Sequence, residues 1–346
     1  MCGIICSIRK EKCKDDSVLR HSLDKIKYRG ADASGTFLSE NKKVFLGHSR
    51  LSIIDLSSAS NQPMFSIDKS YVLIFNGEIY NYIELKEELV NSGYEFYTKS
   101  DSEIIINGFI HWGDQVFSKL NGPFSIVLYS VTLNKLWVAR DRAGEKPLYY
   151  YKTSSLLSFG SDAAAVFDLS ESEKLISIEG LHSYLTHGYA IDNLSLIDGV
   201  KSVKPGDFFI IDCNTFELKR KSFWSPIKIN NNKDPKNPKS PKGLKESVEK
   251  LDLLLLESVD RQLRSDVPVA VMLSGGVDSS LITAYAAKSI DRLNTFTVSF
   301  PGYKEFDESR SAQLIASHFS TNHTVIDGVA IQPEILEEIV ENLDTP

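Results

Sequence analysis

The sequence predicts two bodies of different fold class joined by a polar connector. Residues 1–224 contain many short β-like runs interrupted by a few helical patterns, which indicates an α+β domain built on antiparallel sheets. From residue 244 onward, helical and strand-like segments alternate, which indicates an α/β unit with a parallel sheet and right-handed crossovers. A chain of 346 residues is long enough for about two such domains.

The first body is predicted from two kinds of segment. A strand-like stretch covers residues 3–8, and others follow at 43–55, 71–80, 123–130, 135–141 and 147–152. They are rich in β-branched, aromatic and leucine residues, which favour strands. Helices are expected at 17–27 and 81–93, and Gly93 marks the end of the second.

The connector, residues 225–243, is rich in proline, asparagine and lysine, and no packed core can form from that composition. Its lysines could also be read as a nucleic-acid or membrane patch. We favour a solvated linker because no aromatic residues interleave with them.

The second body, residues 244–346, begins with a predicted helix at 244–264. A strand at 267–273, a helix at 279–289, a strand at 295–300, a helix at 308–319 and a strand at 323–326 are expected next. In such folds, ligands bind at the carboxyl ends of the strands. The loop after residue 273 is therefore the first place to look for a site.

Composition excludes several classes of protein. The chain has 39 basic and 46 acidic residues, so its net charge of −7 argues against a general nucleic-acid binder. No apolar run approaches the roughly 18 residues that span a bilayer. The apolar stretch at Ile4 to Ile8 is too short for a signal peptide and is followed at once by Arg9. We therefore expect a cytoplasmic protein. Its four cysteines are too few for a disulfide framework, and neither they nor the histidines have metal-site spacing.

The loop "SGGVDSS", residues 274–280, joins a predicted strand to a predicted helix. Two glycines let the backbone approach a ligand closely, and the amides of a helix start bind anions, so the loop is suited to phosphates. The Walker spacing and its lysine are absent. Asp278 would repel a phosphate unless a divalent cation lay between them, which indicates Mg²⁺.

These motifs carry a resemblance over essentially the whole chain. "LSGGVDSS" is similar to the pyrophosphate loop of enzymes that activate an oxygen of their substrate with ATP. "MCGI", "RGADASG", "GHSRLSIIDL", "FNGEIYNY", "SDSE" and "DRAGEKPLYY" resemble class II glutamine amidotransferases. Together and in this order they resemble glutamine-hydrolysing asparagine synthetases. The resemblance implies an N-terminal-nucleophile αββα sandwich followed by a partial α/β parallel-sheet domain like the adenine nucleotide hydrolases.

The chemistry of the first body can be argued from Cys2. Removal of Met1 would leave a thiol and an α-amine on one residue, with pKa values near about 8.5 and about 7.7–8, so the amine can accept the thiol proton. Attack on the glutamine side-chain amide would form an oxyanion, which needs preorganised donors. The resemblance assigns these donors to the Asn76 side-chain amide and the Gly77 backbone N–H.

The remaining site residues are also implied by the resemblance. Arg50 would hold the α-carboxylate of glutamine and Glu78 and Asp101 its α-ammonium, while Ile53 and Ile54 line the pocket. ATP and Mg²⁺ would be held by Ser274, Gly275, Gly276, Asp278 and Ser279. Met272 and Val298 would contact adenosine, although ordinary sheet core is almost as good an interpretation of those two residues. The implied substrates are glutamine, aspartate and ATP.

Some features depart from the family pattern. Ala31 stands where the family usually has proline, and Ala143 and Glu145 are unusual in "DRAGEKPLYY". Family members continue well beyond residue 346, so the sequence reads as a fragment or a short gene product. Glutamine-dependent asparagine synthesis is the first hypothesis. A related amidotransferase for another carboxylate, a chain with glutaminase activity alone, a non-catalytic partner and a homodimer stay open.

Overall fold

The computed structural model describes residues 2–13, 17–226, 241–303 and 305–328, together with residues 333, 335, 336 and 339. The described residues up to 226 form one compact unit, and those from 241 to 328 belong to a second. Most of the predicted connector, 225–243, lies outside the described residues. The boundaries 1–224, 225–243 and 244–346 therefore stay predictions.

The first unit contains two six-stranded sheets in which neighbouring strands are antiparallel. The first sheet has the order β10 (Val200–Ser202), β8 (Tyr149–Lys152), β9 (Leu156–Gly160), β1 (Gly3–Arg9), β3 (Val44–Arg50) and β2 (Ala33–Leu38). The second has the order β12 (Leu218–Ser222), β11 (Asp207–Asp212), β7 (Lys135–Arg140), β6 (Phe124–Ser130), β5 (Tyr71–Gly77) and β4 (Met64–Phe65). The N-terminal strand β1 is thus an internal strand, paired on both sides.

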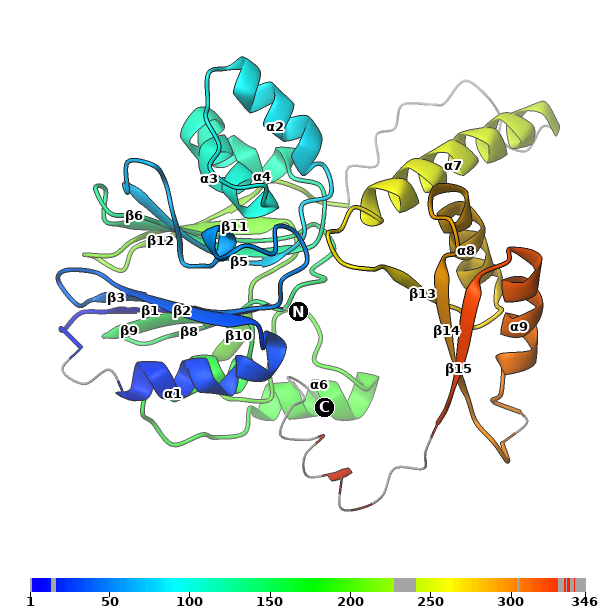
Figure 1. Ribbon diagram of the computed structural model, residues 1–346. Helices are drawn as coiled ribbons and strands as arrows, with labels where there is room; N and C mark the ends of the chain where they lie inside the picture. The colour runs from blue at the N-terminus through cyan, green and yellow to red at the C-terminus, as the bar shows by residue number, and fades with distance from the viewer. Residues whose placement is uncertain are drawn as a thin grey trace. The chain divides into compact units, whose positions relative to one another are not determined.

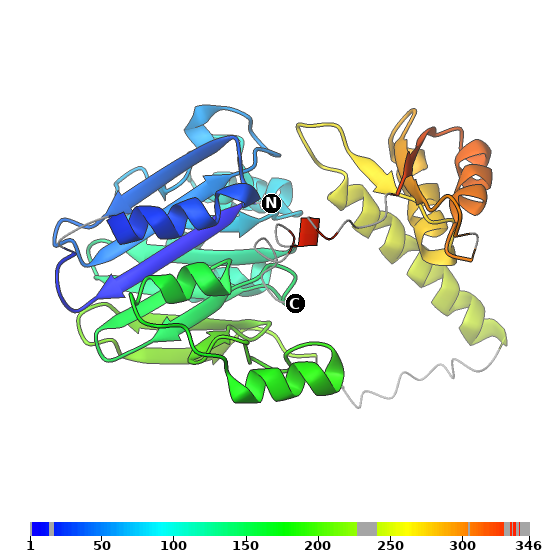
Figure 2. The same cartoon turned by 90° about the horizontal axis from the view of Figure 1, so that it is seen from below.

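Helices cover the outer face of each sheet (Figure 1). α2 (Tyr82–Asn91), α3 (Asp101–Trp112) and α4 (Val116–Lys119) lie over the second sheet, and α1 (Ser17–Lys25) and α5 (Ala163–Asp168) pack on the first. Figure 2 shows α1, in blue, lying over the face of its sheet. α6 (Ile178–His187) and the short 3-10 turns η1 (Lys27–Arg29), η2 (Ser58–Ser60) and η3 (Gly113–Gln115) complete the unit. The four layers confirm the predicted αββα sandwich.

The two-residue period of the strands divides their side chains between an inner and an outer core. In β1, Ile4, Cys6 and Ile8 face the second sheet, while Ile5 packs outward against Leu19 of α1. Each fully buried aliphatic side chain stabilises the fold by about 1.5–3 kcal/mol. Since every side chain from residue 3 to residue 8 is buried, β1 anchors the start of the chain in the sandwich.

Helix α3 is the longest of several elements of this unit that the sequence analysis does not predict, and β2, β9 and β11 are others. Its sequence places Ile104, Ile105 and Ile106 side by side, and all three are buried. A helix buried on most sides shows no amphipathic period, so its apolar run resembles a strand. The Ser100 hydroxyl oxygen accepts a hydrogen bond from the Ser102 N–H at 3.2 Å and begins the helix.

The second unit contains the predicted parallel sheet. β13 (Ala270–Met272), β14 (Asn294–Ser299) and β15 (Asn322–Asp327) pair in that order, and α7 (Pro241–Gln262), α8 (Val277–Ser289) and α9 (Ser309–His318) accompany them. Ala312 and Ala316 of α9 pack on Leu273. Met272, Val298 and Ile326 are exposed among the described residues. None of the described helices of the protein is long and apolar enough to cross a membrane.

The side chain of Asp141 fixes the loop at 142–147 by accepting hydrogen bonds from the backbone of that loop. One carboxylate oxygen accepts hydrogen bonds from the N–H groups of Ala143 and Glu145, both at 3.0 Å. The other accepts from Lys146 at 3.0 Å and from Phe124 at 3.2 Å. Because these bonds involve backbone N–H groups, the unusual side chains of Ala143 and Glu145 do not alter them.

Replacing Asp141 by alanine is expected to lower the free energy of unfolding by about 3–5 kcal/mol, because four N–H groups lose a buried anionic acceptor. Urea denaturation measures the loss. Asp68→Ala is the matched control, since the Asp68 carboxylate accepts bonds from Ser66 and Ser70 in an exposed turn, and it should cost about 1 kcal/mol. Equal losses for the two variants would contradict the role given to Asp141.

Candidate active site

Cys2 lies at the end of the core between the two sheets. It precedes β1 directly and is in phase with Ile4 and Cys6, which face that core. Its thiol contacts Leu51, which follows β3: the Leu51 N–H donates to Sγ at 3.4 Å, and Sγ lies 3.6 Å from the Leu51 carbonyl oxygen. Burial raises the pKa of the Cys2 thiol, and the bond from Leu51 opposes that rise. The thiol therefore needs a base to become a nucleophile.

Asn76 and Gly77 end strand β5 of the opposite sheet. Asn76 is in phase with Val72 and Ile74, which belong to the same inter-sheet core. Asn76 is only 1% exposed, and both its Oδ1 and its Nδ2 atom are buried without a hydrogen-bond partner among the described residues. Unpaired buried amides are rare in folded proteins because they are costly. A Cβ atom on Gly77 would lie 2.2 Å from the Pro123 carbonyl oxygen, so only glycine fits there.

A small hollow of about 30 Å³ lies beside Cys2. Of the residues that the sequence assigns to glutamine, the structure brings Cys2, Arg50, Ile53, Ile54, Gly77, Glu78 and Asp101 to its wall. Asn76 is not on the wall itself, but both of its chain neighbours, Phe75 and Gly77, are. Leu51, Ser60, Gln62, Ser100 and Ser102 also line the hollow, and the sequence analysis does not identify them.

Arg50 organises the loop that forms one wall of the hollow. Its guanidinium donates to the Ser57 carbonyl at 2.9 Å, the Asn61 side-chain carbonyl at 2.7 Å and the Ile54 carbonyl at 3.4 Å, and also to the carbonyl of Asp55. Both terminal nitrogens are therefore occupied by loop oxygens. The predicted contact with a ligand carboxylate stays a prediction, and it requires two of these donors to change partner.

Glu78 and Asp101 place two carboxylates at the same hollow. Burial and the negative charge of Asp101 raise the pKa of Glu78 to about 8. Burial also raises the pKa of Asp101 to about 6, although the Ile79 N–H donates to its Oδ2 at 2.9 Å and opposes the rise. A ligand ammonium between the two carboxylates would lower both of these pKa values. The pair is thus suited to a small cation.

The "RGADASG" segment shapes the neighbourhood of the hollow. The Asp32 carboxylate accepts the Ser52 N–H at 2.7 Å, which fixes the chain just after Leu51. A Cβ atom on Gly30 would lie 2.5 Å from the Ser49 carbonyl oxygen, and one on Gly35 would lie 2.3 Å from that of Gln62. These residues hold β3 and the following loop close to β2.

In the second unit, the loop at 274–279 joins β13 to the start of α8. The hydroxyls of Ser274 and Ser279 lie 2.9 Å apart, and Ser279 also contacts the Gly276 carbonyl at 3.3 Å. Gly275 has a φ of +81°, which suits glycine alone. None of the described side chains caps the N-terminus of α8, so its first amides are available to an anion. These features fit a pyrophosphate group.

Asp278 is exposed in the first turn of α8. The described residues contain no group of three or more histidine, cysteine, aspartate or glutamate side chains that could hold a metal ion. One carboxylate next to a phosphate site fits Mg²⁺, which is often bound through one or two carboxylates and the phosphates of a substrate. Met272 is 65% exposed and Val298 is 37% exposed. Both residues are exposed among the described residues, and both interpretations, adenosine contact and ordinary sheet core, stay predictions.

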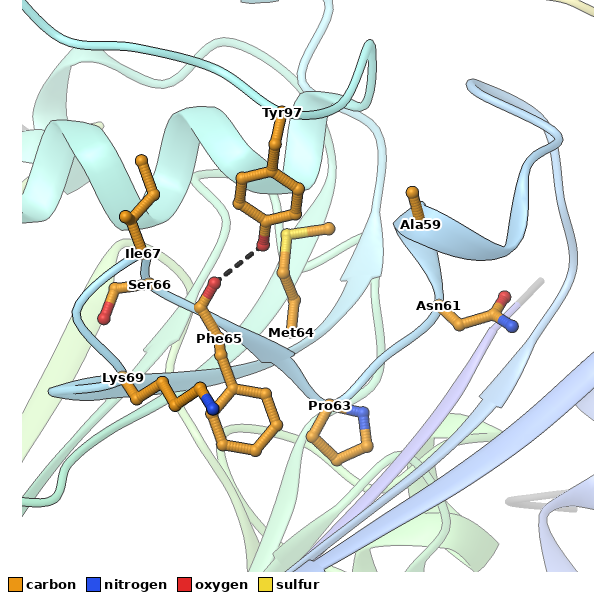
Figure 3. A pocket seen from close by; sticks show the side chains of 9 residues that line it. All are labelled: Ala59, Asn61, Pro63, Met64, Phe65, Ser66, Ile67, Lys69 and Tyr97. Atoms are coloured by element: carbon orange, nitrogen blue, oxygen red, sulfur yellow. Dashed lines mark hydrogen bonds between the residues drawn. The ribbon is translucent and has the colours of Figure 1, made fainter.

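A second hollow lies on the outer side of the loop that Arg50 organises. Figure 3 shows its nine lining residues, from Ala59 to Tyr97, with the Tyr97 hydroxyl directed at the Phe65 carbonyl. That hydrogen bond measures 2.7 Å. The wall carries no cysteine, histidine or carboxylate, so we assign it no chemistry.

Comparison with known proteins matches both units. The family model described as "Glutamine amidotransferase domain" matches residues 1–224, and "Asparagine synthase" matches residues 250–346. Asparagine synthetase [glutamine-hydrolyzing] 1 of Bacillus subtilis is 33% identical over 90% of this chain and 48% of its own length. Amidase chry2 of Gibberella zeae is 34% identical over 86% of this chain and 45% of its own length. The chain spans about half the length of these curated relatives.

Among solved structures, a glutamine phosphoribosylpyrophosphate amidotransferase of B. subtilis matches with a TM-score of 0.49 and 16% identity. The alignment covers 97% of this chain and 70% of that protein.

Replacing Glu78 by glutamine is expected to stabilise the free protein, and increasingly so as the pH rises from 5 to 8. The folded-state pKa of Glu78 is raised from 4.5 to about 8, so over this range the unfolded chain releases a proton that the folded protein retains. The wild type therefore loses stability as the pH rises, and the variant avoids that loss. Urea unfolding at both pH values measures the difference.

Glu87→Gln, at an exposed position on α2, serves as the control and should show no such trend. A Glu78→Gln protein that gains no stability relative to the wild type between pH 5 and pH 8 would refute this electrostatic description.

Proposed function

The chain belongs to the glutamine amidotransferase family and continues into the asparagine synthase family, and from this premise we propose that it transfers the amide nitrogen of glutamine to ATP-activated aspartate. One observation carries the first half of this proposal. The Asn76 amide is buried without a hydrogen-bond partner, and it is preorganised for a charge that forms only during reaction.

Cys2 is the nucleophile of the proposed glutaminase reaction. Loss of Met1 frees the α-amine of Cys2, which takes the thiol proton as Sγ attacks the side-chain carbonyl carbon of glutamine. The Asn76 Nδ2–H and the Gly77 N–H stabilise the resulting oxyanion. The protonated amine then delivers its proton to the leaving nitrogen, ammonia departs, and water hydrolyses the thioester to glutamate. The raised pKa of the buried thiol makes such an internal base necessary.

Glutamine is oriented by charge at its other end. Glu78 and Asp101 accept the α-ammonium. Its positive charge offsets the repulsion between the two carboxylates. Arg50 binds the α-carboxylate by releasing two loop carbonyls and donating instead to the two carboxylate oxygens. A planar guanidinium suits this bidentate geometry. Ile53 and Ile54 provide the apolar side of the pocket.

The second unit supplies the activated acceptor. Ser274, Gly275, Gly276 and Ser279 hold the pyrophosphate portion of ATP at the N-terminus of α8, and Met272 and Val298 contact adenosine. Bound beside Asp278, Mg²⁺ would neutralise phosphate charge. The β-carboxylate of aspartate attacks the α-phosphate and releases pyrophosphate, and ammonia then displaces AMP to give asparagine.

A second candidate is amidation of another carboxylate. Amidase chry2 is as similar to this chain as the asparagine synthetase is, and the names of the two relatives differ. The described residues of the second unit include the loop proposed to hold phosphate, but no acceptor pocket that would distinguish the two. A chain with glutaminase activity alone, or a non-catalytic partner, also stays open.

The glutaminase proposal predicts that Cys2→Ala releases no glutamate from glutamine. Asn76→Ala should lower kcat by about 10²–10³-fold with little change in KM, because its amide acts on the oxyanion and not on the substrate. Glutamate release measured at saturating and limiting glutamine gives both constants. Mass spectrometry of the purified protein should show Cys2 as its first residue. Glutamate release by Cys2→Ala would exclude the mechanism.

Acceptor choice can be measured without glutamine. Pyrophosphate exchange into ATP should depend on aspartate if the proposed acceptor is correct, and Gly276→Val should abolish it by blocking the loop. A panel of other carboxylates tests the alternative. Exchange with a different acid, and none with aspartate, would replace asparagine synthesis by the second candidate.

A further inference from the structure

We propose that Gln62 and His48 are positioning residues: together they hold the Phe75 peptide groups and so set the direction of the Asn76 amide and the Gly77 N–H. The inference rests on the proposed glutaminase function. Neither residue is predicted from the sequence to act in the site, and neither is given a chemical step here.

Gln62 continues a strand ladder with its side chain. β4 pairs Met64 with Leu73, and the same register would place Gln62 opposite Phe75. The ladder ends at Pro63, which lacks an N–H and lies directly before Met64 (Figure 3). Beyond that break, the Gln62 Oε1 accepts the Phe75 N–H at 2.6 Å. A side chain thus replaces the missing backbone partner.

His48 holds the other side of the same residue. It projects from β3 of the first sheet, and its Nε2 lies 3.1 Å from the Phe75 carbonyl oxygen. A carbonyl only accepts, so Nε2 carries the proton and donates. Burial lowers the pKa of His48 to about 3, so the ring stays neutral and keeps this donor at physiological pH. The bond crosses from one sheet to the other.

The constraint continues on the far side of the Asn76–Gly77 pair. The N–H groups of Glu78 and Tyr80 donate to the carbonyls of Pro123 at 3.0 Å and Asn121 at 2.8 Å, and Asp101 accepts the Ile79 N–H. Gln62 Nε2 also donates to the Ser102 hydroxyl at 3.2 Å, which ties the same side chain to the start of α3. The backbone is therefore fixed immediately before and after the two residues that would bind the oxyanion.

Among the described residues, the Asn76 amide has no hydrogen-bond partner that fixes its position. Its placement therefore depends on the backbone that carries it and on the packing around its buried side chain. Displacement of a catalytic group by about 1 Å can lower a rate by about 100-fold. Gln62 and His48 are the described side chains that bond to the peptide groups of Phe75, the residue before it.

The test is glutamine hydrolysis by Gln62→Met, which keeps the length of the side chain but loses both hydrogen bonds. We expect kcat to fall by about 10- to 100-fold while KM changes by less than about threefold. Affinity for glutamate γ-semialdehyde, which forms a tetrahedral adduct with a cysteine thiol, should fall in parallel with kcat. Affinity for glutamate should not.

The His48 variants provide rescue and an independent route if Gln62→Met does not fold. His48→Gln retains an Nε2 donor at similar reach and should keep kcat within about threefold of the wild type, while His48→Leu should lose it as Gln62→Met does. Ser158→Ala is the stability control: it removes a buried 2.9 Å bond to the Val166 carbonyl of α5 and should leave kcat unchanged.

An unchanged kcat in folded Gln62→Met and His48→Leu would overturn the inference, as would a loss confined to KM or an equal loss in Ser158→Ala. A wild-type protein that does not hydrolyse glutamine would instead overturn the proposed function, and the inference with it.

Discussion

The core between the two sheets determines where the candidate site can exist. In strands β1, β3 and β5, every second side chain points into this core. At one end of the core, the next position in this alternation is a polar residue in each strand: Cys2, Arg50 and Asn76. A shift of one residue in any of these strands would turn its polar residue outward. The packing that stabilises the sandwich therefore also fixes the direction in which these three polar side chains point.

Much of the fold was predictable from the sequence because its strands have a clear period and its glycine-rich loop at 274–276 stands between a strand and a helix. Helix α3 was not predictable, since its isoleucine run is buried on most sides and has no helical period. In the site, the motif residues could be named, but Gln62 could not. Its importance comes from a strand register that ends at Pro63, and that register exists only in the folded protein.

The two units differ in how complete their chemistry is among the described residues. The first brings a thiol, a guanidinium and two carboxylates to one small hollow, and the buried Asn76 amide lies between two residues of its wall. The second offers a helix start suited to phosphates, but Met272, Val298 and Ile326 form an exposed apolar surface on its sheet. Parallel sheets are normally covered on both faces. The chain also spans about half the length of its curated relatives. The described residues of the first unit thus bring more functional groups together than those of the second.

The four hydrogen bonds that the Asp141 carboxylate accepts from main-chain N–H groups have an evolutionary consequence. A loop held by its backbone places few demands on its side chains, so residues 143 and 145 can drift in sequence while the loop keeps its shape. Divergence at such a position is then weak evidence for lost activity. The same tolerance makes this loop a suitable place to introduce a label or a new binding residue.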